Sequence, residues 1–150
     1  MIRRFGPPPR RATGYRYRPG AYAVLWRAGH VLVTHQAAPS PEIQLPGGGV
    51  DPGEHPLHAL HREVREETGW SLADARFLGH YRRFCTMPKY GIEAEKICSV
   101  WLARPVMRLG PPSERDHSAH WLSAAAALAH LPDPGSREML HRALRLIHAG

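Results

Sequence analysis

The amino-acid sequence predicts a mixed α/β sandwich, in which strands are interleaved with two or three helices. Two observations support this prediction. Several short strand-like segments are separated by turn residues, and one segment with helical spacing lies between a proline and a glycine. The chain has 150 residues, of which 43% are apolar, so it is long enough to bury one hydrophobic core. We expect one domain over residues 19–150, preceded by a basic arm over residues 1–18.

The arm is rich in proline and arginine. Residues 1–20 contain six arginines and four prolines, three of them consecutive at Pro7–Pro9, without apolar periodicity. This composition is typical of a flexible or extended segment. The formal charge of +7 suits a polyanionic partner. The basic start lacks the apolar segment of a signal peptide, and no apolar run is long enough to span a bilayer. We therefore expect a cytoplasmic protein without a membrane partner.

A hairpin is predicted directly after the arm. Residues Ala21–Arg27 and Val31–Gln36 are strand-like and are joined by the short turn Ala28–His30. Ile43–Leu45 is a further short extended piece, which the turn Pro46–Gly49 ends.

A helix is predicted to begin at Pro56, a residue that suits the first helical turn, and to be capped at its C-terminus by Gly69. Residues at helical spacing form one stripe on it: Leu57, Leu60, Val64 and Thr68. The remaining predicted elements are strands at Ala75–Phe84, Ile97–Val106 and His120–Leu122, a loop around Met87–Gly91, and helices at Ala124–Leu131 and Ser136–His148. Cys85 and Cys98 have no metal-ligand spacing, so we expect free thiols.

Three glutamates of this helix, Glu63, Glu66 and Glu67, lie a quarter-turn or more from the stripe. Like charges at this spacing destabilise a helix by about a few tenths of a kcal/mol per pair. Arg62 and Arg65 lie towards the other side of the cluster and relieve the repulsion only in part. A divalent cation would remove it, and all-oxygen ligands select Mg²⁺, Mn²⁺ or Ca²⁺ over zinc. Taken alone, however, the three glutamates are better explained as a solvated acidic face.

Two neighbouring features favour the cation. Gly47–Gly49 precede the helix, where a backbone without side chains can approach a metal ion or a phosphate closely. Glu54, at the helix entrance, either caps free amides or joins the acidic cluster, and capping is the preferred interpretation.

Together these residues resemble the Nudix box. The pattern is Gly, five residues, Glu, seven residues, and then Arg-Glu-aliphatic-any-Glu-Glu-any-Gly followed by a bulky aliphatic residue. Here it reads Gly48, Glu54, Arg62-Glu63-Val64-Arg65-Glu66-Glu67-Thr68-Gly69 and Trp70. Only Trp70 departs from the pattern, and it is still apolar. The resemblance implies an α/β/α sandwich with a mixed sheet. It also implies Mg²⁺-dependent hydrolysis of a pyrophosphate bond, by metal-activated water, in a nucleoside diphosphate linked to another moiety.

The resemblance also implies roles for individual residues. The implied metal ligands are the Gly48 carbonyl, Glu63, Glu66 and Glu67, with Mn²⁺ as a substitute for Mg²⁺. Arg62 and Glu54 would hold the helix and the loop in place, and Arg62 is counted with Glu63 and Glu66 as the catalytic group. Glu66 or Glu63 is a candidate general base. Other candidates for the general base lie outside the box: Glu93, Glu95, Glu114 and Asp116.

Substrate recognition is less well determined. His35 and Gln44 lie near strand ends ahead of the glycines, Tyr90 lies in a loop beside Lys89, and Glu114 precedes a predicted strand, so these four are substrate-binding candidates. A nucleotide-type substrate is expected, with dinucleoside polyphosphates, ADP-ribose-like compounds, nucleotide sugars and nucleoside triphosphates all open.

Two other functions remain open. The basic arm, with Tyr15 and Tyr17, is compatible with gripping RNA, which would make the chain an RNA 5′-end pyrophosphohydrolase. A non-catalytic nucleotide-sensing domain is the third candidate, although such domains commonly lose box glutamates that this chain keeps. Oligomeric state is open, a homodimer included.

Overall fold

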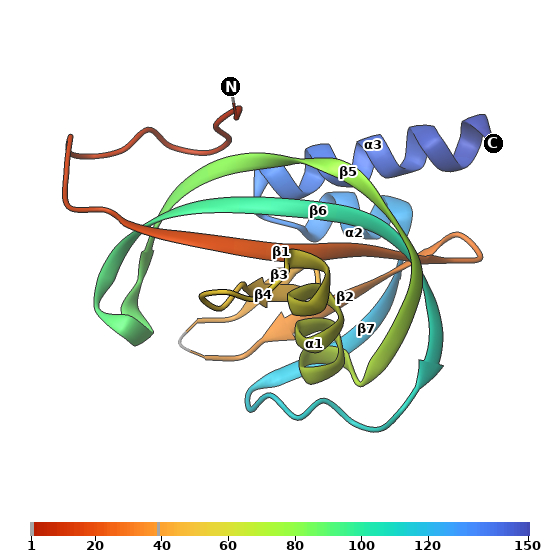
Figure 1. The fold of residues 1–150 in the computed structure, drawn as a ribbon. Helices are drawn as coiled ribbons and strands as arrows, with labels where there is room; N and C mark the ends of the chain where they lie inside the picture. Colours follow the sequence, from red (N-terminus) through yellow and green to blue (C-terminus); the bar gives the residue numbers. More distant parts are fainter. Residues whose placement is uncertain (1, 39) are drawn as a thin grey trace.

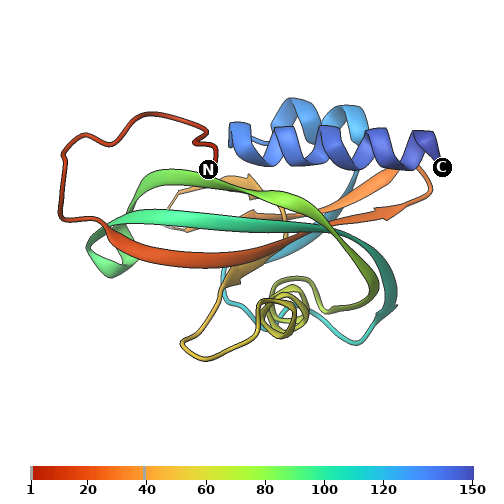
Figure 2. The same ribbon diagram turned by 45° about the horizontal axis from the view of Figure 1, so that its top comes forward.

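A seven-stranded mixed sheet separates the helices into two layers in the computed structural model, which describes residues 2–38 and 40–150. Helix α1 lies on one side of the sheet, and α2 and α3 lie on the other (Figure 1; Figure 2). The predicted α/β sandwich with a mixed sheet is therefore confirmed. In the described part of the chain, no helix has the length and apolar character needed to cross a bilayer.

The elements follow one another in this order: β1 (Arg16–Arg27), β2 (His30–Gln36), β3 (Glu42–Gln44), β4 (Gly47–Gly49), α1 (Pro56–Thr68), β5 (Trp70–Met87), the 3₁₀ turn η1 (Pro88–Tyr90), β6 (Ile92–Arg108), β7 (His117–Ser123), α2 (Ala124–His130) and α3 (Pro134–Ala149). The main sheet path is β3-β2-β1-β6-β5, with β4 paired to β1 and β7 paired to β2. Strands β1 and β6 are parallel, whereas β5 and β6 form a long antiparallel hairpin.

Each predicted element exists, but several strands are longer than predicted. β1 begins at Arg16 rather than Ala21, and the β5–β6 hairpin runs from Trp70 to Arg108 around η1. The additional residues are mostly half-buried or exposed, so they lack the alternation of apolar and polar residues from which strands are predicted. The predicted turn at Gly47–Gly49 is wrong, because these residues form β4 and pair with Gly20–Tyr22 of β1. Glycine carries no strand propensity, so only the pairing reveals the strand.

Two hydrophobic clusters hold the layers together. Alternation along β1 directs Ala21, Ala23 and Leu25 towards α1, where they pack with Leu60 and Val64. On the opposite face, Val24 packs with Tyr81 of β5 and with Met139 and Leu140 of α3. Both cysteines are free thiols, as expected, and Cys98 is buried in this second cluster.

The first residues of the arm lie alongside β5. The Phe5 amide donates to the Arg82 carbonyl at 2.9 Å, and the Arg82 amide donates to the Arg3 carbonyl at 2.8 Å. The Phe5 ring packs edge-on against Tyr81 at 5.9 Å. Residues 3–5 are therefore joined to β5 around the isolated bridge between Arg4 and Arg82. Met1, the first residue of the predicted arm, lies outside the described residues.

Candidate active site

Helix α1 positions the acidic residues of the box. It begins after His55, whose imidazole Nδ1 accepts from the Leu57 amide at 3.1 Å. It ends at Gly69, which has φ 79° and donates to the Arg65 carbonyl, as the sequence predicts. The apolar stripe is buried against the sheet, so the glutamates face β4 and the loop before β7. Glu54 does not cap the helix. His55 does so instead, because Glu54 is held by Arg62.

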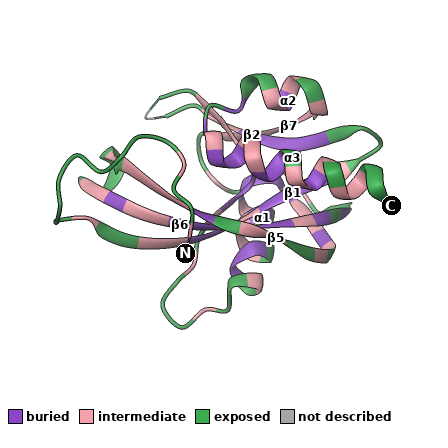
Figure 3. Ribbon diagram, turned by 90° about the horizontal axis from the view of Figure 1, so that it is seen from above, coloured by how far each residue is buried: buried purple, intermediate pink, exposed green. Residues whose placement is uncertain are grey.

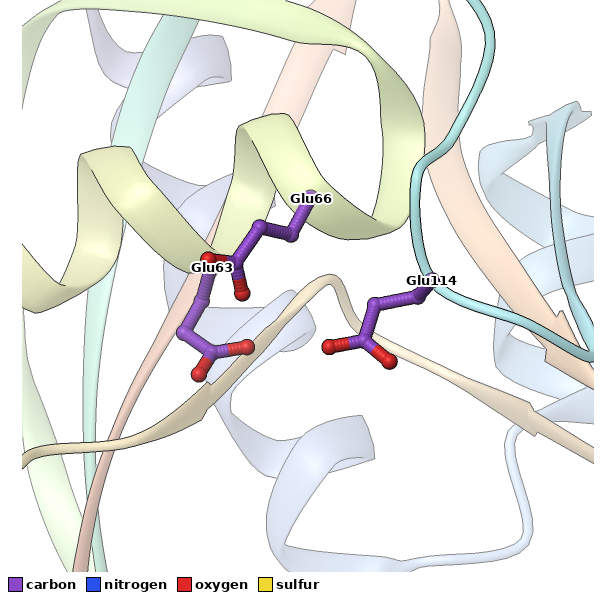
Figure 4. A group of neighbouring side chains, drawn as sticks. All are labelled: Glu63, Glu66 and Glu114. Atoms are coloured by element: carbon purple, nitrogen blue, oxygen red, sulfur yellow. The ribbon is translucent and has the colours of Figure 1, made fainter.

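Three carboxylates gather between α1 and this loop. Glu63, Glu66 and Glu114 each offer an oxygen, and these oxygens lie within 4.8 Å of one another (Figure 4). The amides of Ser113 and Glu114 donate to the Glu66 carbonyl at 2.8 and 3.0 Å, which fastens the loop to the helix. Glu114 is therefore brought to the box by two backbone hydrogen bonds.

Gly48 of β4 lies directly against one of these carboxylates. A Cβ placed on Gly48 would lie 2.5 Å from Cδ of Glu63, with the Oε2 atom in even closer contact. No side chain fits at this position unless Glu63 moves. The backbone of β4 therefore approaches the Glu63 carboxylate closely at Gly48.

Arg62 is the cation of this cluster. Its guanidinium donates to Glu54 at 2.8 Å, to Glu63 at 2.8 Å and to the Gly49 carbonyl at 3.1 Å, and Nη1 lies 3.4 Å from Glu66. The prediction that Arg62 lies away from the acidic residues is wrong, because its long side chain reaches back across the helix. Hydrogen bonds from Arg62 and from the Asp51 amide hold the pKa of Glu54 well below its ordinary value.

Glu67 has different partners from the other glutamates. It is buried, and its carboxylate accepts from the Gly47 amide at 2.9 Å and lies 3.2 Å from Nε2 of His117. Burial raises the pKa of Glu67, and the hydrogen bonds from His117 and Gly47 oppose this effect. The hydrogen bond to Glu67 raises the pKa of His117 in turn. Nothing local in the sequence singles out His117, because its partner is fifty residues away.

The four carboxylates of the site carry more negative charge than their cations balance. Glu63, Glu66 and Glu67 belong to one helix, and Glu114 lies beside them. Arg62 is shared with Glu54, so it does not neutralise the cluster. Burial raises the pKa of Glu63 while Arg62 opposes this change, so ionised Glu63 lacks part of its compensation. An oxygen-only donor set with excess negative charge fits a hard divalent cation.

The other predicted residues lie elsewhere. His35 is on β2, opposite Ile43 of β3, and Gln44 is on β3, opposite Thr34. Tyr90 lies in η1 at the tip of the β5–β6 hairpin, away from α1 (Figure 1). Among the general-base candidates outside the box, Glu114 alone joins the cluster in the described part of the chain. Glu93 pairs with Arg10, Glu95 pairs with Arg82, and Asp116 is exposed.

A pocket of about 430 Å³ lies at the C-terminal end of α1. Its wall includes Thr68, Trp70, Arg108, His117 and Trp121. Trp70, the one departure from the box, packs edge-on against Trp121 at 5.8 Å. The aromatic residue therefore fills a local packing role that leaves the carboxylates in place.

Comparisons with known proteins place this geometry among known relatives of the chain. The chain is 36% identical over 67 residues to a Bacillus subtilis protein provisionally named an 8-oxo-dGTP diphosphatase (45% of each chain), and 34% identical over 93 residues to the RNA pyrophosphohydrolase of Photorhabdus laumondii (60% of this chain, 48% of the relative). It thus spans just under half the length of these curated relatives.

Solved structures match over most of the chain. A MutT NUDIX hydrolase from Burkholderia pseudomallei has a TM-score of 0.64 and 27% identity, covering 85% of this chain and 98% of that one. The MutT protein of Methanosarcina mazei has a TM-score of 0.72 at 23% identity, covering 91% and 99%, and this likeness shows the fold alone. The sequence matches the NUDIX domain over residues 16–143. With the box glutamates on α1 and the matching fold, this chain belongs to the NUDIX family.

Proposed function

We propose that the chain hydrolyses a pyrophosphate bond in a nucleoside diphosphate linked to another moiety, and that the reaction depends on Mg²⁺. The observation that supports this proposal most directly is the convergence of Glu63, Glu66 and Glu114 within 4.8 Å. The names of the relatives, a diphosphatase and RNA pyrophosphohydrolases, support the same reaction class.

In this proposal Glu63 and Glu66 are the principal metal ligands, next to the Gly48 backbone. A bound divalent cation lowers the pKa of a coordinated water and offsets the negative charge of the phosphoryl group. Arg62 orients both ligands through its hydrogen bonds. We retain Glu67 in the metal site as a fourth carboxylate, and its bonds to Gly47 and His117 also hold β4 and β7 against the helix.

Glu114 is our choice for the general base. Glu63 and Glu66 both contact Arg62, so one oxygen of each carboxylate is already engaged by the guanidinium. Within residues 2–38 and 40–150, no cationic side chain lies within 4.0 Å of the Glu114 carboxylate. It is therefore better suited than the other two to hold the attacking water and accept its proton.

Replacement of Glu66 tests the core of the proposal. Glu66→Gln keeps the shape of the side chain and the backbone carbonyl that fastens the Glu114 loop, so the protein should remain folded. Turnover of a nucleotide diphosphate should fall by about 10³-fold or more, and half-saturation with Mg²⁺ should require a higher concentration. Glu138→Gln, on α3, is the matched control. Unchanged Mg²⁺-dependent turnover in Glu66→Gln would contradict the proposal.

Identification of the substrate requires a comparison of candidate compounds. Dinucleoside polyphosphates, ADP-ribose, nucleotide sugars, oxidised nucleoside triphosphates and 5′-triphosphorylated RNA should be compared with Mg²⁺, with both products identified. Metal-dependent release of a phosphate-containing product from any of them would dismiss the third candidate, a nucleotide-sensing domain without catalysis. No turnover of any compound would support it.

RNA is the second candidate substrate, because several relatives are named RNA pyrophosphohydrolases and the arm is basic. Deletion of residues 1–18 would also remove the Phe5–Tyr81 contact and the start of β1. Replacing the exposed Arg11 and Arg16 with glutamine avoids this problem. If the arm binds RNA, the double variant should show weaker RNA turnover with a flatter salt dependence, and unaltered turnover of a mononucleotide.

A further inference from the structure

The face of the mixed sheet beyond the N-terminus of α3 carries a row of three cations. Cross-strand register places Arg18 of β1 beside Lys96 of β6, and Lys96 beside Arg83 of β5. Neighbouring strands lie about 5 Å apart, so the three side chains start from adjacent positions. We call Arg18, Lys96 and Arg83 the cation row.

All three side chains leave the sheet on the same face. Lys96 and Arg83 lie two residues from Cys98 and Tyr81, which belong to the core under α3. Arg18 lies two residues from Gly20, which is paired with Cys98. Because side chains alternate along a strand, residues two apart share a face. Figure 3 shows that α3 covers one part of the sheet, and that β5 and β6 continue beyond it with largely half-buried and exposed residues.

The charges of the row are poorly compensated. Within the described chain, no carboxylate lies within 4.0 Å of the Lys96 ammonium or of the Arg18 guanidinium. Arg83 lies 3.8 Å from Asp133, but that carboxylate already accepts from Tyr81, Ser136 and the Gly135 amide. Glu42 is the other acid that acts on Arg83.

Lys96 is the centre of the row and is partly buried. The neighbouring Tyr22 raises the pKa of Lys96 above its ordinary value, and burial opposes this effect. Like charges at directly opposed sheet positions are destabilising. A row of this kind therefore lowers stability unless an anion binds to it.

The surroundings of the row suit a nucleotide. Tyr22 lies beside Lys96, with Nζ 5.9 Å from the ring centre, and the Arg18 guanidinium lies 5.1 Å from the ring centre of Tyr90. Arg83 also lines a pocket of about 390 Å³ between the arm and β5, together with Arg10 and Tyr15. This volume is within the range of small-molecule sites.

The row is connected to the carboxylate cluster through β4. A Cβ on Gly47 would lie 2.8 Å from Cδ1 of Tyr22, so the Tyr22 ring packs on this glycine. The Gly47 amide in turn donates to Glu67. The contacts of Gly47 with Tyr22 and with Glu67 therefore join the two sites through β4.

We propose that the cation row binds a phosphoryl group of the substrate at a subsite separate from the carboxylate cluster. This inference rests on the proposed function for the identity of the ligand as a nucleotide. Such a subsite favours substrates with an additional phosphoryl group over those in which the leaving moiety is uncharged.

Binding of inorganic triphosphate in EDTA tests the row without catalysis. Lys96→Met keeps the length of the side chain and removes the charge. By calorimetry, Lys96→Met should bind triphosphate about 10- to 100-fold more weakly than the unmodified protein. Its thermal stability without ligand should be equal or higher, because repulsion is removed. Arg104→Met, also on β6, is the matched control, and Lys96→Arg should restore most of the binding.

Two results would overturn the proposal. One is unchanged triphosphate binding by Lys96→Met. The other is a loss of stability in that variant that Lys96→Arg does not rescue, because this indicates a purely structural lysine. The Glu66→Gln protein separates this inference from the proposed function. It should lose hydrolysis while binding triphosphate in EDTA at least as tightly as the unmodified protein.

Discussion

Replacing Gly48 with alanine should disable the carboxylate cluster and leave the fold intact. The new Cβ would lie 2.5 Å from Cδ of Glu63, whereas ordinary carbon–carbon contact begins at about 3.5 Å. The carboxylate must therefore move by about 1 Å. Gly48 does not have positive φ, so alanine fits the backbone, and removing a glycine from a strand favours folding by about 0.5–1 kcal/mol. The penalty falls on Glu63 and its function.

A displacement of about 1 Å at a reacting centre costs roughly 100-fold in rate, which corresponds to about 2.7 kcal/mol of transition-state stabilisation. The assay is kcat/KM for a nucleotide substrate over a range of Mg²⁺ concentrations, together with thermal unfolding. Gly48→Ala should lose about 100-fold in kcat/KM and need more Mg²⁺, with its unfolding temperature preserved or raised.

Gly49→Ala is the control, because it lies on the same strand and no atom lies within 4 Å of its added Cβ. It should keep near-normal activity. The reasoning is refuted if Gly48→Ala stays within about threefold of the unmodified protein. Equal impairment of the two variants would also refute it.

Two further predictions concern other members of the site. Glu67→Gln should lose nearly all activity and remain folded, because the amide oxygen of the introduced glutamine can still accept from Gly47; unimpaired Mg²⁺-dependent turnover would contradict the assignment of Glu67 to the metal site. Glu54→Gln should lower the free energy of unfolding at neutral pH, as measured with urea. Because the pKa of Glu54 is depressed in the folded state, the stabilisation by its carboxylate is complete above its ordinary pKa and is lost as pH falls below about 4. The unfolding free energies of the two proteins should therefore converge in acid. A difference that stays constant with pH would contradict this prediction.

The box helix was predictable from the sequence because its signals are local. Pro56, the apolar stripe and the capping glycine Gly69 lie within one segment, and each acts on its own neighbours. The ends of β5 and β6 were less predictable, because strand composition reflects burial and these ends have little of it. Pairing between distant segments, which also creates β4, leaves no mark in local composition.

Contacts between distant segments also limited how much of the site could be predicted from the sequence. Glu63 and Glu66 were identifiable from spacing, whereas the position of Glu114 depends on the loop that binds the Glu66 carbonyl. His117 and Lys96 were not singled out, because a single histidine or lysine has no distinguishing pattern. Their partners, Glu67 and the two arginines of the cation row, lie on other elements.

The hydrogen bonds from Ser113 and Glu114 to the Glu66 carbonyl mean that the box alone does not carry the whole site to another protein. A graft of residues 48–69 onto another scaffold would transfer the glutamates of the helix and omit Glu114. The recipient would also have to supply a loop whose two amides meet the last turn of the helix. Leu109, at the other end of this loop, is also fastened, because its amide donates to the Gly69 carbonyl at 2.7 Å, so changes in loop length during divergence should be selected against on both sides of the attachment.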